Sequence, residues 1–250
     1  MVLNRRSRLG TTMLLTFAST VCALAGCSTS ETGPDSSVAA SETSTARSEL
    51  TTAETTSAPP VAPARIDIER LAEIRGDFPP DFPPGPPREP TKEAPAYAHL
   101  VGDAVSFGKP FTVDPPQCRA LLDPVDGQAG ADRMLVGAQG PAEQVISVIV
   151  SNPVTVPAGL PSTGCERMSF HVENDVNYGT AARLAAPNID GAVTSAIKVI
   201  PEKSEFVGYN YIAILDGRVF IEVVARVHPN FQAEPLLAIL LSKGVAAIRG

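Results

Sequence analysis

YNYIAILDGRVFIEVVARV, residues 209–227, is the stretch that decides the fold. It places two runs of strand-forming residues around Asp216-Gly217, a pair that is typical of a two-residue hairpin turn. Counting outward from that turn sets Ile214 opposite Val219 and Ile212 opposite Ile221, as a core face. The opposite face would then carry Tyr209, Tyr211, Phe220, Glu222 and Arg226. The stretch therefore predicts an antiparallel hairpin with one mixed aromatic and charged face.

Further strands are predicted on both sides of a central cysteine. Residues 133–138 and 144–151 predict two strands, the second of which is a run of β-branched side chains. Residues 166–172 alternate, with Cys165 directly before them. Residues 193–200 give one more strand. Asp114, ahead of Pro115, predicts the N-cap of a short helix that carries Cys118, Leu121 and Leu122 on one face.

The chain ends on an apolar helix, predicted over residues 231–249. Its apolar side chains form a stripe wide enough to lie across a sheet: Leu236, Leu237, Ile239, Leu240, Leu241, Val245 and Ile248. Together these elements predict an α+β domain over residues 97–250. We expect a largely antiparallel sheet of five to six strands, with helices, including the C-terminal one, packed on one face.

An arm over residues 61–96 precedes this domain. It begins with a short helix, in which Ile68, Leu71 and Ile74 share a stripe, and continues as proline-rich extended chain. One interpretation is a docking segment for the aromatic groove of a partner. The favoured one is an arm whose Phe78 and Phe82 pack onto the chain's own domain.

The first 26 residues have the three parts of a secretory signal peptide: a positive start, a short apolar core and small residues before Cys27. Residues 24–27, LAGC, resemble a bacterial lipobox. The resemblance implies cleavage before Cys27 and acylation of its sulfur, which would hold the protein on the outer face of the cell membrane. The alternative is an ordinary signal peptide that ends on a chance cysteine.

Residues 28–60 predict a disordered tether. Sixteen of these 33 residues are Ser or Thr and none is aromatic, so the segment offers too little apolar surface to offset its chain entropy. The tether is either an unmodified spacer or, by its resemblance to actinobacterial segments of this kind, O-mannosylated.

Charge limits the partners of the chain. Residues 1–26 contain three Arg and no acidic residue. The rest of the chain therefore has 27 acidic and 17 basic residues, a formal net charge of −10. This excess of acid argues against nucleic acid as a partner and against a basic patch that binds membranes.

Two cysteines remain after cleavage and lipidation, Cys118 and Cys165. In an oxidising envelope such a pair predicts one disulfide, although two free buried thiols are the alternative.

No motif for catalysis, metal binding or cofactor binding stands out. His99, His171 and His228 lie far apart in the sequence, and the acidic run at residues 173–179 lacks the glycine and the final acid of a calcium loop. We therefore expect no enzyme, no metal and no cofactor. Tyr209, Tyr211, Phe220 and Glu222 form the candidate ligand cleft, with an ordinary packed sheet face as the favoured alternative.

The lipobox, the tether, the Phe-Pro-Pro arm, Cys118 and Cys165 and the hairpin are together similar to mycobacterial envelope lipoproteins of unknown function. More distantly, the chain resembles the extracellular sensor domain of the kinase PknH. The resemblance implies an antiparallel sheet and helices that frame a ligand cleft. Those sensor domains have two disulfides, whereas this chain can form one.

These observations favour a membrane-anchored module of the cell envelope that binds a small or lipidic ligand or a protein partner. The first alternative is a scaffold lipoprotein that docks a membrane protein through its proline-rich arm. The second is an envelope hydrolase whose site is assembled from distant residues.

Overall fold

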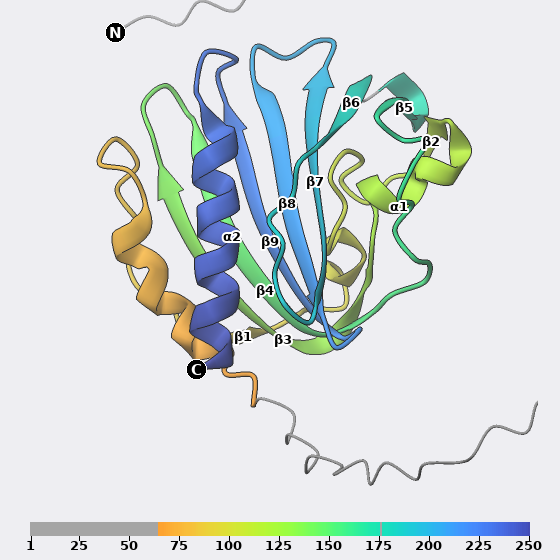
Figure 1. Cartoon of the computed structure of the whole chain (residues 1–250). Helices are drawn as coiled ribbons and strands as arrows, with labels where there is room; N and C mark the ends of the chain where they lie inside the picture. Colours follow the sequence, from red (N-terminus) through yellow and green to blue (C-terminus); the bar gives the residue numbers. More distant parts are fainter. Residues whose placement is uncertain (1–64, 176) are drawn as a thin grey trace, which may run out of the picture. The chain divides into compact units, whose positions relative to one another are not determined.

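The computed structural model describes residues 65–175 and 177–250. They form an antiparallel sheet of nine strands in the order β1-β3-β4-β9-β8-β7-β6-β5-β2 (Figure 1). The strands are β1 (Thr91–Lys92), β2 (Phe111–Asp114), β3 (Asp126–Gln139), β4 (Val145–Thr155), β5 (Arg167–Val172), β6 (Tyr178–Leu184), β7 (Ala192–Pro201), β8 (Val207–Leu215) and β9 (Val219–Val227). The helical segments are η1 (Ile68–Asp77), η2 (Ala98–Leu100), η3 (Pro116–Cys118), α1 (Arg119–Leu122), η4 (Glu173–Asp175) and α2 (Ala233–Arg249).

The predicted α+β fold with five to six strands is wrong, because the sheet has nine. The missed strands are β1, β2 and β6. Two of them are short, and β6 is rich in Ala and Gly with no regular alternation of burial. Such a segment becomes a strand because its neighbours β5 and β7 pair with it, which no local pattern reveals. The Asp114 cap is also wrong: Asp114 ends β2, and η3 begins at Pro116.

The central hairpin forms as predicted, but its register is shifted by one residue. The amide of Arg218 donates to the carbonyl of Leu215 across a turn whose central residues have φ of 51° and 65°. Leu215 then pairs with Val219, so Arg218 is an extra residue and Ile214 lies opposite Phe220. A shift of one residue moves every side chain of one strand to the other face.

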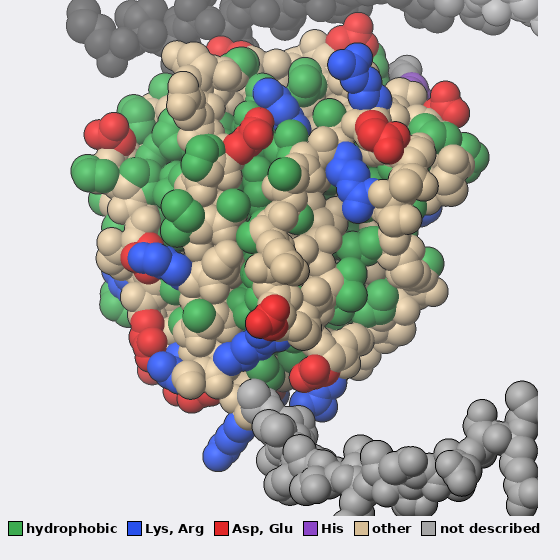
Figure 2. Space-filling view, in the orientation of Figure 1, with side chains coloured by type: hydrophobic (Ala, Val, Ile, Leu, Met, Phe, Trp, Pro, Cys, Tyr) green, Lys and Arg blue, Asp and Glu red, His purple; other side chains and the backbone are tan. Residues whose placement is uncertain are grey.

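One face of the sheet is covered by α2 and η1, and we call it the α2 face (Figure 1). Leu237, Leu240 and Leu241 of α2 are fully buried there against β9. Gly244 lets the helix come close to the sheet, because a Cβ atom at this position would lie only 2.8 Å from Cδ1 of Ile221. Ile239, predicted in the stripe, is instead exposed. Figure 2 shows the outer surface on this side, where acidic and basic side chains are scattered among hydrophobic ones.

The short helix predicted at the start of the arm is confirmed as η1, in a tighter form. Ile68, Leu71 and Ile74 are its buried residues, and their spacing of three matches the three residues per turn of a 3₁₀ helix. The side chain of Asp67 caps it by accepting a hydrogen bond from the amide of Glu69, at 3.1 Å.

The proline-rich arm packs on the α2 face and on strand β3. Phe78 and Phe82 are buried in the core of the α2 face, and the ring of Phe82 lies 5.2 Å from that of Phe231. Farther on, β1 pairs with β3 at the edge of the sheet. The favoured interpretation, an arm anchored on its own domain by two phenylalanines, is confirmed.

The opposite face is covered by residues 93–125, here called the cover segment, and we call this face the cover face. Val101 and Val125 of the cover segment pack on Ile212, Ile214 and Phe220, and its cysteine and leucines pack on β5 and β7. The helical segments therefore lie on both faces of the sheet, whereas one helix-covered face was expected.

The predicted signal peptide (residues 1–26), the predicted lipidation site Cys27 and the predicted tether (residues 28–60) lie outside the described residues.

Candidate functional site

The four residues of the predicted cleft do not share one surface. Tyr209 and Tyr211 lie on the α2 face, whereas Phe220 and Glu222 lie on the cover face, because of the shifted register. All four are buried, with exposed fractions between 1 and 8%. Burial, together with the charge of Glu234 on α2, raises the pKa of Tyr211 to about 12. The predicted cleft is therefore wrong as a set, although Tyr209 and Glu222 each border a cavity.

The cavity beside Tyr209 has a volume of about 460 Å³ and lies between the cover face and the loops at one end of the sheet. Its lining is mainly apolar and comes from four separate parts of the chain: Ala104, Phe107, Val199, Pro201, Phe206 and Val224. Gly208 of β8 also borders it, and a Cβ atom added there would meet only Val199, at 3.4 Å or more. This size and lining are typical of sites for small molecules.

A rigid loop forms one wall of this cavity. The carboxylate of Asp103 accepts hydrogen bonds from the amides of Val105 and Ser106, at 3.0 and 2.7 Å, from the Ser106 hydroxyl and from the amide of Gly108. The loop holds Phe107 at a φ of 53°, and 77% of this residue is exposed. Such a conformation is uncommon for a bulky residue and is found at functional sites. The loop thus presents an exposed aromatic ring beside the cavity.

Two cationic side chains border the same cavity, each against a ring. The ammonium of Lys203 lies 4.9 Å from the ring centroid of Tyr178, and the guanidinium of Arg226 lies 4.4 Å from that of Phe206. Arg226 also forms an ion pair with Glu143 at 3.6 Å, but both side chains are more than half exposed, and such pairs contribute little. The cavity therefore combines an apolar lining with positive charge.

Asn210 is a buried polar residue of the cavity lining, with an exposed fraction of 5%. Its neighbours across the ladder are Val224 on β9 and Ile197 on β7. Its Oδ1 has no hydrogen-bond partner among the described residues. An unpaired buried amide oxygen is costly, and it is a feature that a ligand can satisfy.

Glu222 lies next to Asn210 and borders a second, smaller cavity of about 190 Å³. Burial raises the pKa of Glu222 to about 7, with a further rise from Asp103, while the charge of Arg133 and the hydrogen bond from Asn210 oppose it. Arg133 forms an ion pair at 3.3 Å with the buried Glu93, which borders the same cavity. The cover face therefore holds a carboxyl group that changes its charge near neutral pH.

Unpaired polar atoms gather on the cover face. Within the part of the chain that the structure describes, the buried side-chain atoms without a hydrogen-bond partner are Oγ of Ser151, Oγ of Ser195, Oδ1 of Asn210 and Nε of Arg133. The last of these is the atom that forms the ion pair with Glu93, so three of the four have no partner. The ladder places all four residues on the same face as Glu222, in three adjacent rows. Sequence reasoning missed this cluster. Its visible signal was Asn210, a lone amide inside an otherwise apolar strand.

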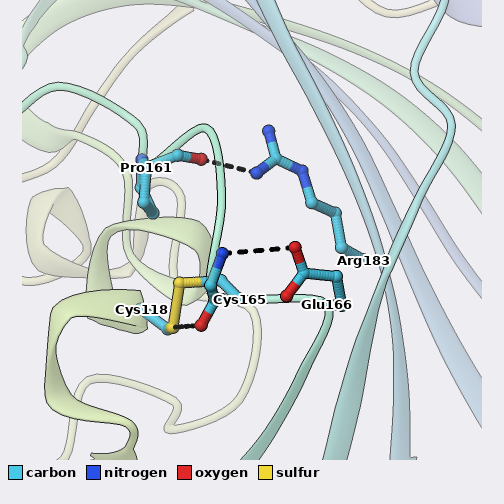
Figure 3. The surroundings of a disulfide bond; sticks show 6 residues. Cys118, Pro161, Cys165, Glu166 and Arg183 are labelled. Atoms are coloured by element: carbon cyan, nitrogen blue, oxygen red, sulfur yellow. Dashed lines mark hydrogen bonds between the residues drawn. A yellow bond between two sulfur atoms is a disulfide. The ribbon is translucent and has the colours of Figure 1, made fainter.

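The predicted disulfide between Cys118 and Cys165 is present, and both residues are fully buried (Figure 3). It ties the cover segment to the loop before β5. The amide of Gly164 donates to the carboxylate of Glu166 at 3.2 Å, and Arg183 donates to the carbonyl of Pro161 at 2.5 Å. The two hydrogen bonds fix the loop before β5, within itself and to β6, and the disulfide ties the cover segment to that loop.

The histidines lie apart, as the sequence indicated: His99 in η2, His171 in β5 and His228 after β9, stacked on Phe206 at 4.7 Å. Within residues 65–175 and 177–250, no group of three or more His, Cys, Asp or Glu side chains is placed to hold a metal ion. Among the same residues, none of the helices has the length and apolar character needed to cross a membrane.

Comparison with known proteins gives a family and a structural neighbour. Residues 67–249 match the family described as "Domain of unknown function (DUF5642)". A crystal structure of an uncharacterized protein from Mycobacterium smegmatis, described as an Rv0999 ortholog, is similar with a TM-score of 0.57 and 23% identity over 74% of this chain and 98% of that chain. No curated protein matches the chain. The coarser part of the resemblance, to mycobacterial proteins of unknown function, agrees with both findings.

Proposed function

The chain belongs to the family described as a domain of unknown function (DUF5642), and we propose from the geometry of its cover face that it is a ligand-binding module. The observation that carries the proposal is the apolar cavity of about 460 Å³ beside the exposed ring of Phe107. A folded protein of this size has few such cavities, and a largely apolar lining with a few polar groups favours a small, mainly apolar molecule.

The second part of the proposal concerns where the protein is located in the cell. The lipobox-like residues 24–27 and the Ser/Thr-rich tether support a lipoprotein held by acylated Cys27 on the outer face of the cell membrane. The anchor is tested by phase partition in detergent. The wild-type chain should enter the detergent phase and Cys27→Ser the aqueous phase, and equal partition of the two would reject the anchor.

Binding is tested with the mature chain without its acylated cysteine, residues 28–250, secreted through a cleavable leader. After native purification, mass spectrometry should find an amphiphile bound at one molecule per chain. Ligands that bind only the native state raise the free energy of unfolding, by about 2.7 kcal/mol at a ligand concentration of 100 times Kd. An unaltered melting curve with every amphiphile tried, and an empty chain in the spectrum, would reject the proposal.

A cavity-filling variant makes the test specific. Gly208→Val adds a side chain at a position that borders the cavity, where the new Cβ makes ordinary contacts to Val199, and valine suits a strand. The variant should fold with equal or greater stability and lose the ligand. Val193→Ile is the matched control, because it also enlarges a side chain on the cover face but lies outside the cavity lining. Retention of the ligand by Gly208→Val would place binding elsewhere.

The scaffold alternative keeps one supporting observation. Residues 85–89 of the arm are exposed, although Phe78 and Phe82 are buried. Replacing residues 85–89 by a Gly/Ser segment of equal length leaves both phenylalanine anchors in place. This replacement should abolish co-purification of a partner protein if the arm is the docking site, and unchanged co-purification would remove the alternative.

A further inference from the structure

The unpaired oxygen of Asn210 restricts what the cavity can bind. Because Asn210 is flanked by Val224 and Ile197 and is 95% removed from solvent, the neighbouring side chains of these strands have no donor to offer its Oδ1. The hydrogen bond toward Glu222 uses the other end of the amide, since it lowers the pKa of that carboxyl and so comes from the N–H. The oxygen is thus left for a donor that enters the cavity.

The positive charge of the cavity lies close to this oxygen. Arg226 pairs with Gly208, and Gly208 lies two residues before Asn210 on the same strand. Two residues of a strand span about 7 Å, which is the distance between these two rows of the sheet. Lys203 borders the cavity from the loop that follows β7. The acid in the same lining, Asp103, already accepts four hydrogen bonds within its own loop, so it does not present a free carboxylate to a cationic ligand.

We propose that the ligand is an anionic amphiphile with a hydroxyl or amide N–H close to its charged end. The anion lies between Lys203 and Arg226, the donor binds Oδ1 of Asn210, and the apolar remainder fills the cavity. This inference rests on the proposed function, because it names the chemistry of the ligand of the same cavity.

Four dodecyl probes on the mature chain, residues 28–250, test the inference by calorimetric titration. Dodecanoate has the anion alone, 3-hydroxydodecanoate and dodecanoylglycine add a donor near it, and dodecyltrimethylammonium reverses the charge. A hydrogen bond to a buried unpaired acceptor should favour the two donor-bearing probes over dodecanoate by about tenfold. The cationic probe should bind more weakly than all three anions.

Two variants separate the parts of the inference. Asn210→Leu, which keeps the branched shape of the side chain and is apolar, should remove the advantage of the donor-bearing probes and keep the affinity for dodecanoate. Lys203→Gln with Arg226→Gln should weaken all three anions about equally and keep their order. Arg218→Gln, an exposed arginine in the turn at the other end of the hairpin, is the matched control and should change nothing.

The outcomes distinguish this inference from the proposed function. If the wild-type chain binds dodecanoate as tightly as the two donor-bearing probes, the role of Asn210 is wrong while the binding module stands. A donor advantage that persists in Asn210→Leu leads to the same conclusion. Equal binding of the cationic probe overturns the anionic part, and failure of all four probes to bind overturns both. The comparison of probes on the wild-type chain needs no variant to fold.

Discussion

The two faces of the sheet are built from the same strands but differ in what they bury. On the α2 face, α2 and the phenylalanines of the arm meet a surface of apolar side chains and two tyrosines. On the cover face, a carboxyl group and three polar atoms that have no partner among the described residues lie among apolar residues, and the cavities beside Asn210 and Glu222 open there. Unpaired buried polar groups lower stability, so proteins retain them mainly at functional sites. The comparison indicates one face for stability and one for binding.

The covers of the two faces are also held differently. α2 is held by apolar packing, as its buried leucines show, whereas the cover segment is tied by a disulfide that closes a loop with a sequence separation of 47. By the chain-entropy estimate, such a bridge contributes about 4 kcal/mol to the free energy of unfolding.

The largest effect is expected from removing this bridge. Cys118→Ser with Cys165→Ser should lower the free energy of unfolding by about 4 kcal/mol. It should also weaken ligand binding at temperatures where the chain is still folded, because one wall of the cavity belongs to the cover segment. Denaturant unfolding and calorimetric titration measure the two quantities.

Leu240→Ala on α2 is the matched control for this prediction. Leu240 is fully buried on the α2 face, so its truncation should cost about 2–5 kcal/mol, a destabilisation of similar size. The folded variant should keep its affinity for the ligand. If Leu240→Ala weakens binding as much as loss of the disulfide does, the two faces are not independent, and the comparison fails.

The next effect comes from Glu222 and depends on pH. Since burial raises its pKa from 4.5 to about 7, the native chain binds more protons than the unfolded chain between these values. The free energy of unfolding should therefore fall as pH rises from about 4.5 to 7, by on the order of 3 kcal/mol. Glu222→Gln should remove this part of the pH dependence and be the more stable chain at pH 8.

The charges around Glu222 belong to Arg133, Glu93 and Asp103, and they remain in the variant. Glu205→Gln, at an exposed position, is the control and should leave the pH dependence unchanged. Parallel stability curves for the wild type and Glu222→Gln would show that Glu222 ionises like an exposed acid, and the description of the cover face would then need correction.

The sequence predicts elements better than it predicts faces. The hairpin, the C-terminal helix and β5 follow from local signals, and the disulfide follows from counting cysteines. The face of each hairpin residue depends on whether Arg218 belongs to the turn or to the strand, and Asp216-Gly217 fits both. That single residue moved Tyr209 and Tyr211 away from Phe220 and Glu222. Strand β6 depends on pairing with β5 and β7, so tertiary contact decides it.

The site was less predictable than the fold for a related reason. The cavity is lined by residues near positions 104, 178, 200, 208 and 225, and their proximity follows from strand order, which the sequence does not state. Asn210 could have been noticed, because an amide inside an apolar strand must either meet a partner or remain unpaired. Which of the two applies depends on Val224 and Ile197, the residues placed beside it by the register.

The smallest effect on the free energy of unfolding is expected from removing a hydroxyl on the cover face and, in a second variant, adding one on the α2 face. Ser195 on the cover face is 3% exposed with its Oγ unpaired, so Ser195→Ala removes a polar group that has no partner to lose. Its free energy of unfolding should change by less than about 0.5 kcal/mol or rise slightly. Ala213 is fully buried in the apolar α2 face on the neighbouring strand, and Ala213→Ser should cost about 2 kcal/mol.

Urea unfolding of the two variants measures both changes under one condition. The two substitutions exchange the same atoms in opposite directions, so side-chain volume alone predicts effects of equal size and opposite sign. The polar character of the cover face instead predicts one clear loss and one near-zero change. A loss above 1 kcal/mol in Ser195→Ala would mean that its hydroxyl contributes to the native state, and the cover face would then be as fully satisfied as the α2 face. A near-zero result would leave Ser195, with Asn210, as a buried polar group that stability does not require.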